Sequence, residues 1–149
     1  VVLGRPGNES ARLLQGVEYR SFGYVSDARL VSLLYAAADV HLFTSTADNL
    51  PFSVLETSAA GTPTVGFATG GAPEMVEPEK TGFLVPTGDM PGLTVGLRRA
   101  LSSDTASRWG VAAREKIAKE FSFELMKERH LRLYAEILER RTAPPKKAG

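Results

Sequence analysis

Short apolar runs alternate with longer stretches of helical periodicity along the chain up to residue 85. The runs that predict strands lie at residues 1–3, 17–22, 40–43, 64–67 and 83–85. Strands that alternate with helices usually form a parallel sheet built from βα units. We therefore expect an α/β fold with a doubly wound parallel sheet, followed by extra helices at the C-terminal end.

Helix signals fall between the apolar runs. Asp27 precedes leucines at helical spacing and is a good N-cap. Pro51 suits a first helical position, and Gly61 is placed to end the helix that starts there. Shorter helices are predicted at residues 9–15 and 73–76.

The segment after residue 85 has the pattern of three helices. The first follows Asp89, the second contains Trp109, and Ser122 is placed to cap a long third helix. In the third helix an apolar stripe faces away from the charged residues and contains Met126, Leu133, Tyr134, Ile137 and Leu138. We interpret residues 1–142 as one domain and residues 143–149 as a disordered tail.

Composition narrows the classes of function. The 149 residues carry a formal net charge of +1, which gives no reason to expect nucleic acid as a partner. The absence of cysteine excludes disulfides and thiolate metal sites and fits a reducing compartment, so we expect a cytoplasmic protein. No apolar run is long enough to span a bilayer. A peripheral membrane contact is a second hypothesis, based on basic residues of the last helix: Lys127, Arg129, Arg140 and Arg141.

The residues that are candidates for binding a ligand lie between residues 44 and 71. Asp48 follows a predicted strand, and Glu56 lies eight residues later on the next helix. In a parallel sheet such a loop sits at the carboxyl edge, where ligands bind. The N-terminus of that helix suits a diphosphate, and the Glu56 carboxylate suits the two hydroxyls of a ribose. We expect Asp48 and Glu56 to open to one cleft, with Gly70 and Gly71 allowing backbone to approach the ligand.

The residues alone leave other interpretations open. Two acids at this spacing are common by chance, and two glycines after a strand often form a plain turn. The two histidines, His41 in a strand and His130 in the last helix, are expected to be packing residues rather than acid–base groups.

Several motifs together resemble a known family. They read DNLPFSVLETSAAGTPTV at 48–65, GGAPE at 70–74, TGFLV at 81–85, FGYV at 22–25 and LYAAADV at 34–40. In order and spacing they resemble the C-terminal, donor-binding domain of retaining GT-B glycosyltransferases of family GT4. The resemblance implies a Rossmann-like domain that binds a nucleotide diphosphate sugar.

The resemblance also implies roles for individual residues. Asp48 and Glu56 would be the acid pair of the catalytic site, with Glu56 on the ribose and Asp48 on the transferred sugar. The further residues expected to bind substrate are Tyr24 and Val25 beside the nucleobase, the backbone of Asn49, Leu50, Pro51, Phe52 and Ser53, and Gly70 and Gly71. The first acid is commonly glutamate in this family, so Asp48 is a departure that bears on the choice of sugar. No Asp-x-Asp motif occurs, and we expect no metal and no cofactor.

Two parts of the family's enzymes are expected ahead of this chain. One is the first βα unit of the domain, with a Gly-Arg pair and a Lys-Gly pair that neutralise the diphosphate. The other is the N-terminal domain that holds the acceptor, so we expect this chain alone to be inactive. Two alternatives remain: a non-catalytic module that binds a nucleotide or nucleotide sugar, and a doubly wound domain of another family, such as an epimerase-like relative.

Overall fold

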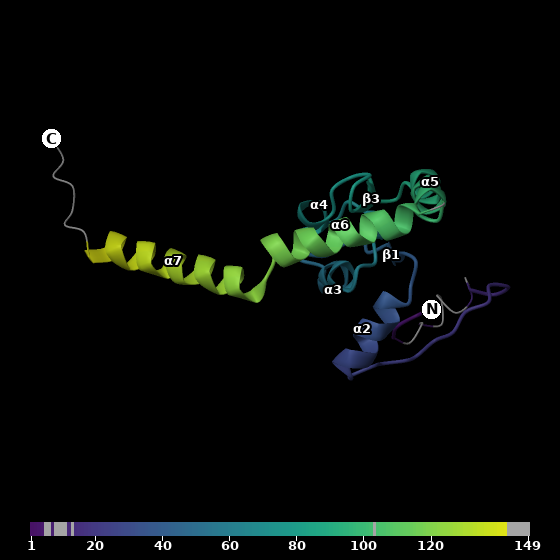
Figure 1. Ribbon diagram of the computed structural model, residues 1–149, viewed down its shortest axis with the longest axis horizontal. Coiled ribbons are helices and arrows are strands. Elements are labelled where there is room, and N and C mark those ends of the chain that lie inside the picture. Colours follow the sequence, from purple (N-terminus) through teal and green to yellow (C-terminus); the bar gives the residue numbers. More distant parts are fainter. Residues whose placement is uncertain (5–6, 8–11, 13, 103, 143–149) are drawn as a thin grey trace.

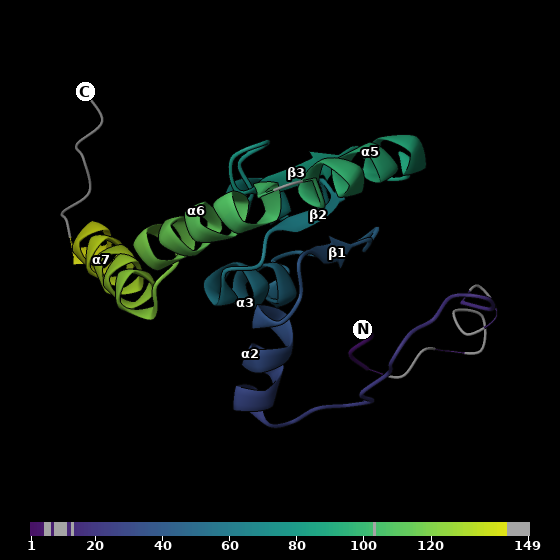
Figure 2. The same ribbon diagram turned by 45° about the vertical axis from the view of Figure 1, so that its right-hand side comes forward.

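The centre of the fold is a parallel sheet of three short strands. A computed structural model of the chain describes residues 1–4, 7, 12, 14–102 and 104–142. The strands are β1 (His41–Phe43), β2 (Thr64–Phe67) and β3 (Gly82–Val85), in that order across the sheet (Figure 2). The expected α/β class and its parallel sheet are confirmed. The predicted tail at 143–149 and much of the predicted helix at 9–15 lie outside the described residues.

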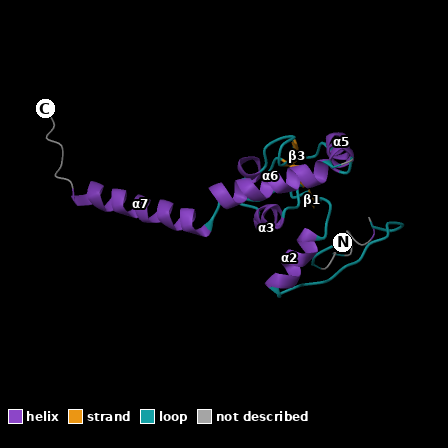
Figure 3. Cartoon of the chain, viewed as in Figure 1, coloured by secondary structure: helices purple, strands orange, loops and turns teal. Residues whose placement is uncertain are grey.

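Helices pack on both faces of this sheet, and Figures 1 and 3 show where these helices lie in the chain. They are α2 (Ala28–Ala36), α3 (Phe52–Ala60), α4 (Ala72–Met75), α5 (Met90–Ala100), α6 (Thr105–Glu120) and α7 (Phe123–Thr142). The helix α5 packs on β2 and β3, whereas α3 packs against α6 and α2. Coverage of both faces is what the doubly wound pattern predicts.

Two apolar clusters hold the layers together. Val65 and Phe67 lie two residues apart on β2, so they point to the same face, where they pack with Leu93 of α5. Phe43 of β1 belongs to the other cluster, with Val54 of α3. The alternation of strand side chains therefore divides the core between α5 on one face and α3 on the other.

The predicted helix boundaries have visible causes. The Asp27 carboxylate accepts a hydrogen bond from the Arg29 amide at 2.8 Å, and the Asp89 carboxylate accepts one from the Gly92 amide at 2.9 Å. Gly61 ends α3 in the left-handed conformation at φ 86°, which a glycine adopts without strain. Pro51 is the N-cap of α3, one position before the first helical residue where we expected it.

The two strands expected before residue 23 do not join the sheet. Val2 and Ser21 form a single parallel bridge, and Gly4 and Gly23 a single antiparallel one. Apolar side chains of this region, including Val17, remain exposed. A short strand pair gains little stability unless a helix or a third strand covers its apolar face. These two apolar segments therefore form no strands of the sheet, and the prediction of two sheet strands from them was wrong.

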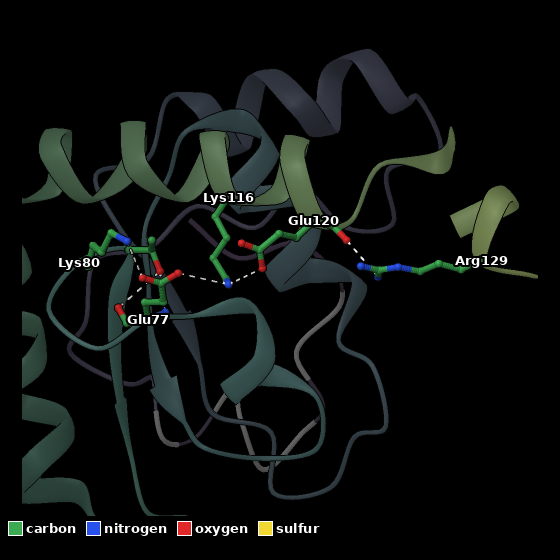
Figure 4. Close-up of polar contacts among 6 residues, drawn as sticks. Glu77, Lys80, Lys116, Glu120 and Arg129 are labelled. Carbon is green, nitrogen blue, oxygen red and sulfur yellow. Dashed lines mark hydrogen bonds and ion pairs between the residues drawn. The ribbon is translucent and has the colours of Figure 1, made fainter. Parts of the chain in front are cut away.

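A cluster of charged side chains ties the segment before β3 to α6 and α7 (Figure 4). Lys116 of α6 contacts Glu77 at 3.2 Å and Glu120 at 2.7 Å, and Lys80 contacts Glu77 at 2.7 Å. Hydrogen bonds from Lys80 and Lys116 lower the pKa of Glu77, and the bond to Glu120 raises the pKa of Lys116. Arg129 of α7 donates to the Glu120 carbonyl oxygen at 3.4 Å, so this cluster also reaches α7.

The helix α7 projects away from the rest of the domain (Figure 1). Ser122 accepts a hydrogen bond from the Leu125 amide at 3.3 Å, as its predicted role as a cap requires. The five residues of the predicted apolar stripe are 43–61% exposed. None of the helices in the described part of the chain is long and apolar enough to cross a membrane.

We expect Gly110→Ala to destabilise the fold because Gly110 of α6 packs directly on the backbone of Gly61. A methyl group at Gly110 would collide with the Gly61 carbonyl oxygen. Overpacking costs about 1–3 kcal/mol, and helix propensity returns at most about 1 kcal/mol. The free energy of unfolding, measured in urea, should therefore fall by about 1–2 kcal/mol.

The neighbouring residue Val111 supplies the control. Val111 is 59% exposed, and Val111→Ala should change the free energy of unfolding by less than about 0.5 kcal/mol. A gain in stability for Gly110→Ala would contradict the close helix contact.

Candidate functional site

The helix α3 has one buried face and one open face. Val54, Thr57 and Ser58 are buried against the core. At 100° per residue, the side of the helix opposite these three carries Glu56, with Ala59 beside it. Packing of the buried face therefore fixes the side of the helix from which Glu56 projects.

A cavity of about 490 Å³ lies against this open face. Its lining comes from α2, α3 and the segment before α2, and consists of Tyr24, Val25, Ser26, Ala28, Val31, Ser32, Tyr35, Glu56, Ala59 and Ala60. Of the described residues that line it, Glu56 alone carries a charge. The cavity thus brings Glu56 together with Tyr24 and Val25, which lie more than 30 residues earlier in the chain.

Tyr35 of α2 is the direct neighbour of Glu56. Its hydroxyl donates a hydrogen bond to the Glu56 Oε2 atom at 3.2 Å. Burial raises the pKa of Tyr35, and the charge of Glu56 and the hydrogen bond to it raise this pKa further. Sequence reasoning gave Tyr35 no role, although the residue lies within the LYAAADV motif.

The carboxyl ends of the strands form a second part of the site. The loop after β1 contains Asp48 and Asn49, and the loop after β2 contains Gly70 and Gly71. The Gly71 amide donates to the Asn49 carbonyl oxygen at 2.7 Å. A Cβ atom at Gly70, which has φ 55°, would collide with the Asp48 carbonyl oxygen. The two glycines therefore let these loops approach each other, and their approach to a ligand stays a prediction.

The other predicted residues lie in the loop after β1 and in the first turn of α3. Asp48, Asn49, Leu50 and Phe52 are exposed, Ser53 is half-buried and Pro51 is buried. Within the described chain Pro51 makes no side-chain capping bond to α3. The Val54 amide donates to the Pro51 carbonyl oxygen at 3.0 Å, so the amides of Phe52 and Ser53 are the first-turn N–H groups left for a ligand. Asp48 follows β1 as expected, but it is not among the described residues that line the Glu56 cavity.

His41 is a packed histidine, as predicted. Its Nδ1 atom lies 3.1 Å from the Thr64 hydroxyl and 3.2 Å from the Thr57 hydroxyl. Burial lowers the pKa of His41 to about 4, so it is neutral at physiological pH. Among the described residues, no three Asp, Glu or His side chains gather where they could hold a metal ion.

Comparison with known proteins identifies the family. The model of the family "Glycosyl transferases group 1" matches residues 7–116. A curated relative, N-acetyl-alpha-D-glucosaminyl L-malate synthase of Bacillus anthracis, is 29% identical over 109 residues. That match covers 72% of this chain and 29% of the relative, so the chain spans under a third of the relative's length. The chain belongs to the glycosyl transferases group 1 family.

Solved structures show the same fold. Sucrose-phosphate synthase from Thermosynechococcus elongatus superposes with a TM-score of 0.79 and 29% identity, over 90% of this chain and 35% of that one. Anabaena HepE, solved in complex with UDP, superposes with a TM-score of 0.73 and 21% identity, over 85% of this chain and 34% of that one. The predicted resemblance to GT-B glycosyltransferases is therefore confirmed.

The depressed pKa of His41 predicts a pH dependence of stability. The unfolded chain protonates His41 near pH 6.5, whereas the folded chain does so only near pH 4. The contribution of neutral His41 is therefore fully present above pH 6.5 and is lost as the pH falls from 6.5 to about 4. Such a shift corresponds to about 3 kcal/mol. In urea unfolding experiments, the free energy of unfolding of His41→Gln should therefore fall less between pH 6.5 and about 4 than that of the wild type.

The second histidine supplies the matched control. His130 lies exposed on α7, away from the buried surroundings of His41, so the decline in stability that burial of His41 causes should persist in His130→Gln. Carboxylates such as Glu77 contribute equally to the pH profiles of the wild type and the variants, so their contribution cancels when the profiles are subtracted. Equal pH profiles for wild type and His41→Gln would show that His41 is not buried as described.

Proposed function

We propose that this chain is the donor-binding half of a retaining glycosyltransferase that moves a sugar from a nucleotide diphosphate to an acceptor. The observation that carries the proposal is the placement of Glu56, the charged group in a cavity that Tyr24 and Val25 also line. The complex of Anabaena HepE with UDP supports a uridine nucleotide as the first ligand to test.

Glu56 is suited to a ribose. An ionised carboxylate accepts several hydrogen bonds, and neighbouring 2′ and 3′ hydroxyls present two donors at matching spacing. Bonds to a charged acceptor are about twice as strong as neutral ones. The nucleobase would then lie against Tyr24 and Val25, where Tyr24 is 85% exposed and offers an open aromatic face.

The diphosphate and the sugar belong to the carboxyl edge of the sheet. Uncapped N–H groups at the start of α3 attract an anion, and the helix dipole adds to that attraction. The backbone from Asn49 to Ser53 would meet phosphate or sugar oxygens, with Gly70 and Gly71 beside it. Asp48 would accept a bond from a sugar hydroxyl, with a shorter reach than the glutamate common at this position.

The chemical role of this half is positioning and charge stabilisation. In the transfer, the bond between the sugar's anomeric carbon and the diphosphate oxygen breaks. The oxygen of an acceptor hydroxyl forms the new bond to that carbon, and the hydroxyl proton passes to the departing diphosphate. Preorganised donors lower the energy of the departing diphosphate, and a fixed orientation of the donor sugar lowers the entropic cost. We propose that the acceptor site lies in a preceding domain, that neither metal nor cofactor takes part, and that the enzyme works in the cytoplasm or at its membrane surface.

We expect the 149-residue chain to bind UDP weakly through Glu56. If the cationic pairs of the first βα unit lie ahead of this chain, two charge-assisted contacts are lost at about 1.5–3 kcal/mol each. The dissociation constant, measured by NMR titration, should then be about millimolar. In Glu56→Ala the shifts of α3 residues should fail to saturate at the same UDP concentrations.

An exposed glutamate elsewhere serves as the control. Glu115 lies on the outer side of α6, and Glu115→Ala should titrate like the wild type. Equal shifts in Glu56→Ala and wild type would remove the ribose role from Glu56. Saturation of the wild type at micromolar UDP would favour the non-catalytic binding module instead.

A further inference from the structure

We propose that Tyr35 is a positioning residue that holds the Glu56 carboxylate toward the ribose of the bound nucleotide. This inference rests on the proposed function, because it assumes that Glu56 meets the ribose. It adds a residue that touches the carboxylate from another helix, 21 positions earlier in the chain.

The geometry makes Tyr35 a fixed donor. Its hydroxyl lies 3.2 Å from one carboxylate oxygen of Glu56, and both residues line the same cavity. The phenol stays protonated at physiological pH, since the pKa of Tyr35 is raised above its ordinary value. A protonated phenol donates one hydrogen bond, which leaves the remaining lone pairs of the carboxylate for ligand hydroxyls.

Contacts with neighbouring residues hold Tyr35 itself in place. The Thr62 hydroxyl, on a residue only 2% exposed, donates to the Tyr35 carbonyl oxygen at 2.6 Å. The aromatic ring lies against the His41 ring, with centroids 6.5 Å apart. His41 is in turn fixed by the hydroxyls of Thr57 and Thr64. The chain of contacts runs from the sheet through Tyr35 to Glu56.

Glu56 needs such a partner because its own surroundings restrain it little. The residue is exposed, and a glutamate side chain loses considerable rotamer entropy when a ligand orders it. Among the described residues, Tyr35 is the one whose side chain donates a hydrogen bond to the Glu56 carboxylate. A carboxylate ordered before binding loses less entropy when the ribose arrives, which raises affinity without a new ligand contact.

The test compares UDP with 2′,3′-dideoxy-UDP, which lacks both ribose hydroxyls, in NMR titrations of four proteins. These are the wild type, Tyr35→Phe, Glu56→Ala and the double variant. The wild type should prefer UDP. Tyr35→Phe should weaken UDP binding about 3–10-fold, the range for one hydrogen bond of about 1 kcal/mol, and leave dideoxy-UDP binding unchanged. In the Glu56→Ala background, Tyr35→Phe should add nothing, because a residue that acts through Glu56 has no effect without it.

Tyr134→Phe on α7 is the matched control and should behave like the wild type. Equal loss of affinity for both nucleotides in Tyr35→Phe would indicate damage to the cavity and overturn the positioning role. Unchanged UDP affinity in Tyr35→Phe would overturn that role and leave the donor site standing. If the wild type bound both nucleotides equally, or bound neither, the proposed function itself would fail, and the role of Tyr35 with it.

Discussion

The packing of α3 against the sheet and against α6 is the constraint on which the rest of the site depends. Val54, Thr57 and Ser58 fix one face of this helix in the core, and the glycine contact between Gly61 and Gly110 sets how closely α6 approaches. Once that face is fixed, helix geometry turns Glu56 toward α2. A rotation of α3 by one residue, about 100°, would remove the carboxylate from the cavity.

Parallel pairing of the strands supplies the second constraint. Because β1 and β2 run in the same direction, the loops that follow them meet at one edge, where the Gly71 amide bonds to the Asn49 carbonyl oxygen. This contact sets the path of the chain into the first turn of α3. The site therefore has two parts on one helix: N–H groups at its start that suit an anion, and a carboxylate further along that suits hydroxyls.

Local signals in the sequence predicted the elements of the fold well. Caps such as Asp27, Asp89 and Gly61 act within a few residues, so the helix ends could be found without knowledge of the tertiary structure. The strands at residues 1–3 and 17–22 were not found in the sheet, because an apolar run predicts burial only when a partner surface exists. Within the described chain those segments pair only through two isolated bridges.

The candidate site could be predicted only in part. The motifs singled out Glu56, Tyr24 and Val25, and the structure places all three at one cavity. The bond between Tyr35 and Glu56 joins two helices, and no periodicity within either helix predicts which residues meet across them. The separation of Asp48 from that cavity also depends on loop geometry, which hydrophobic patterns do not encode.

A crystal structure of this chain with UDP at millimolar concentration would test the central claim most directly. The account predicts that the ribose hydroxyls lie about 2.6–3.2 Å from the Glu56 carboxylate oxygens, with the diphosphate at the N-terminus of α3. A nucleotide bound with its ribose away from Glu56, or on the far edge of the sheet, would contradict it.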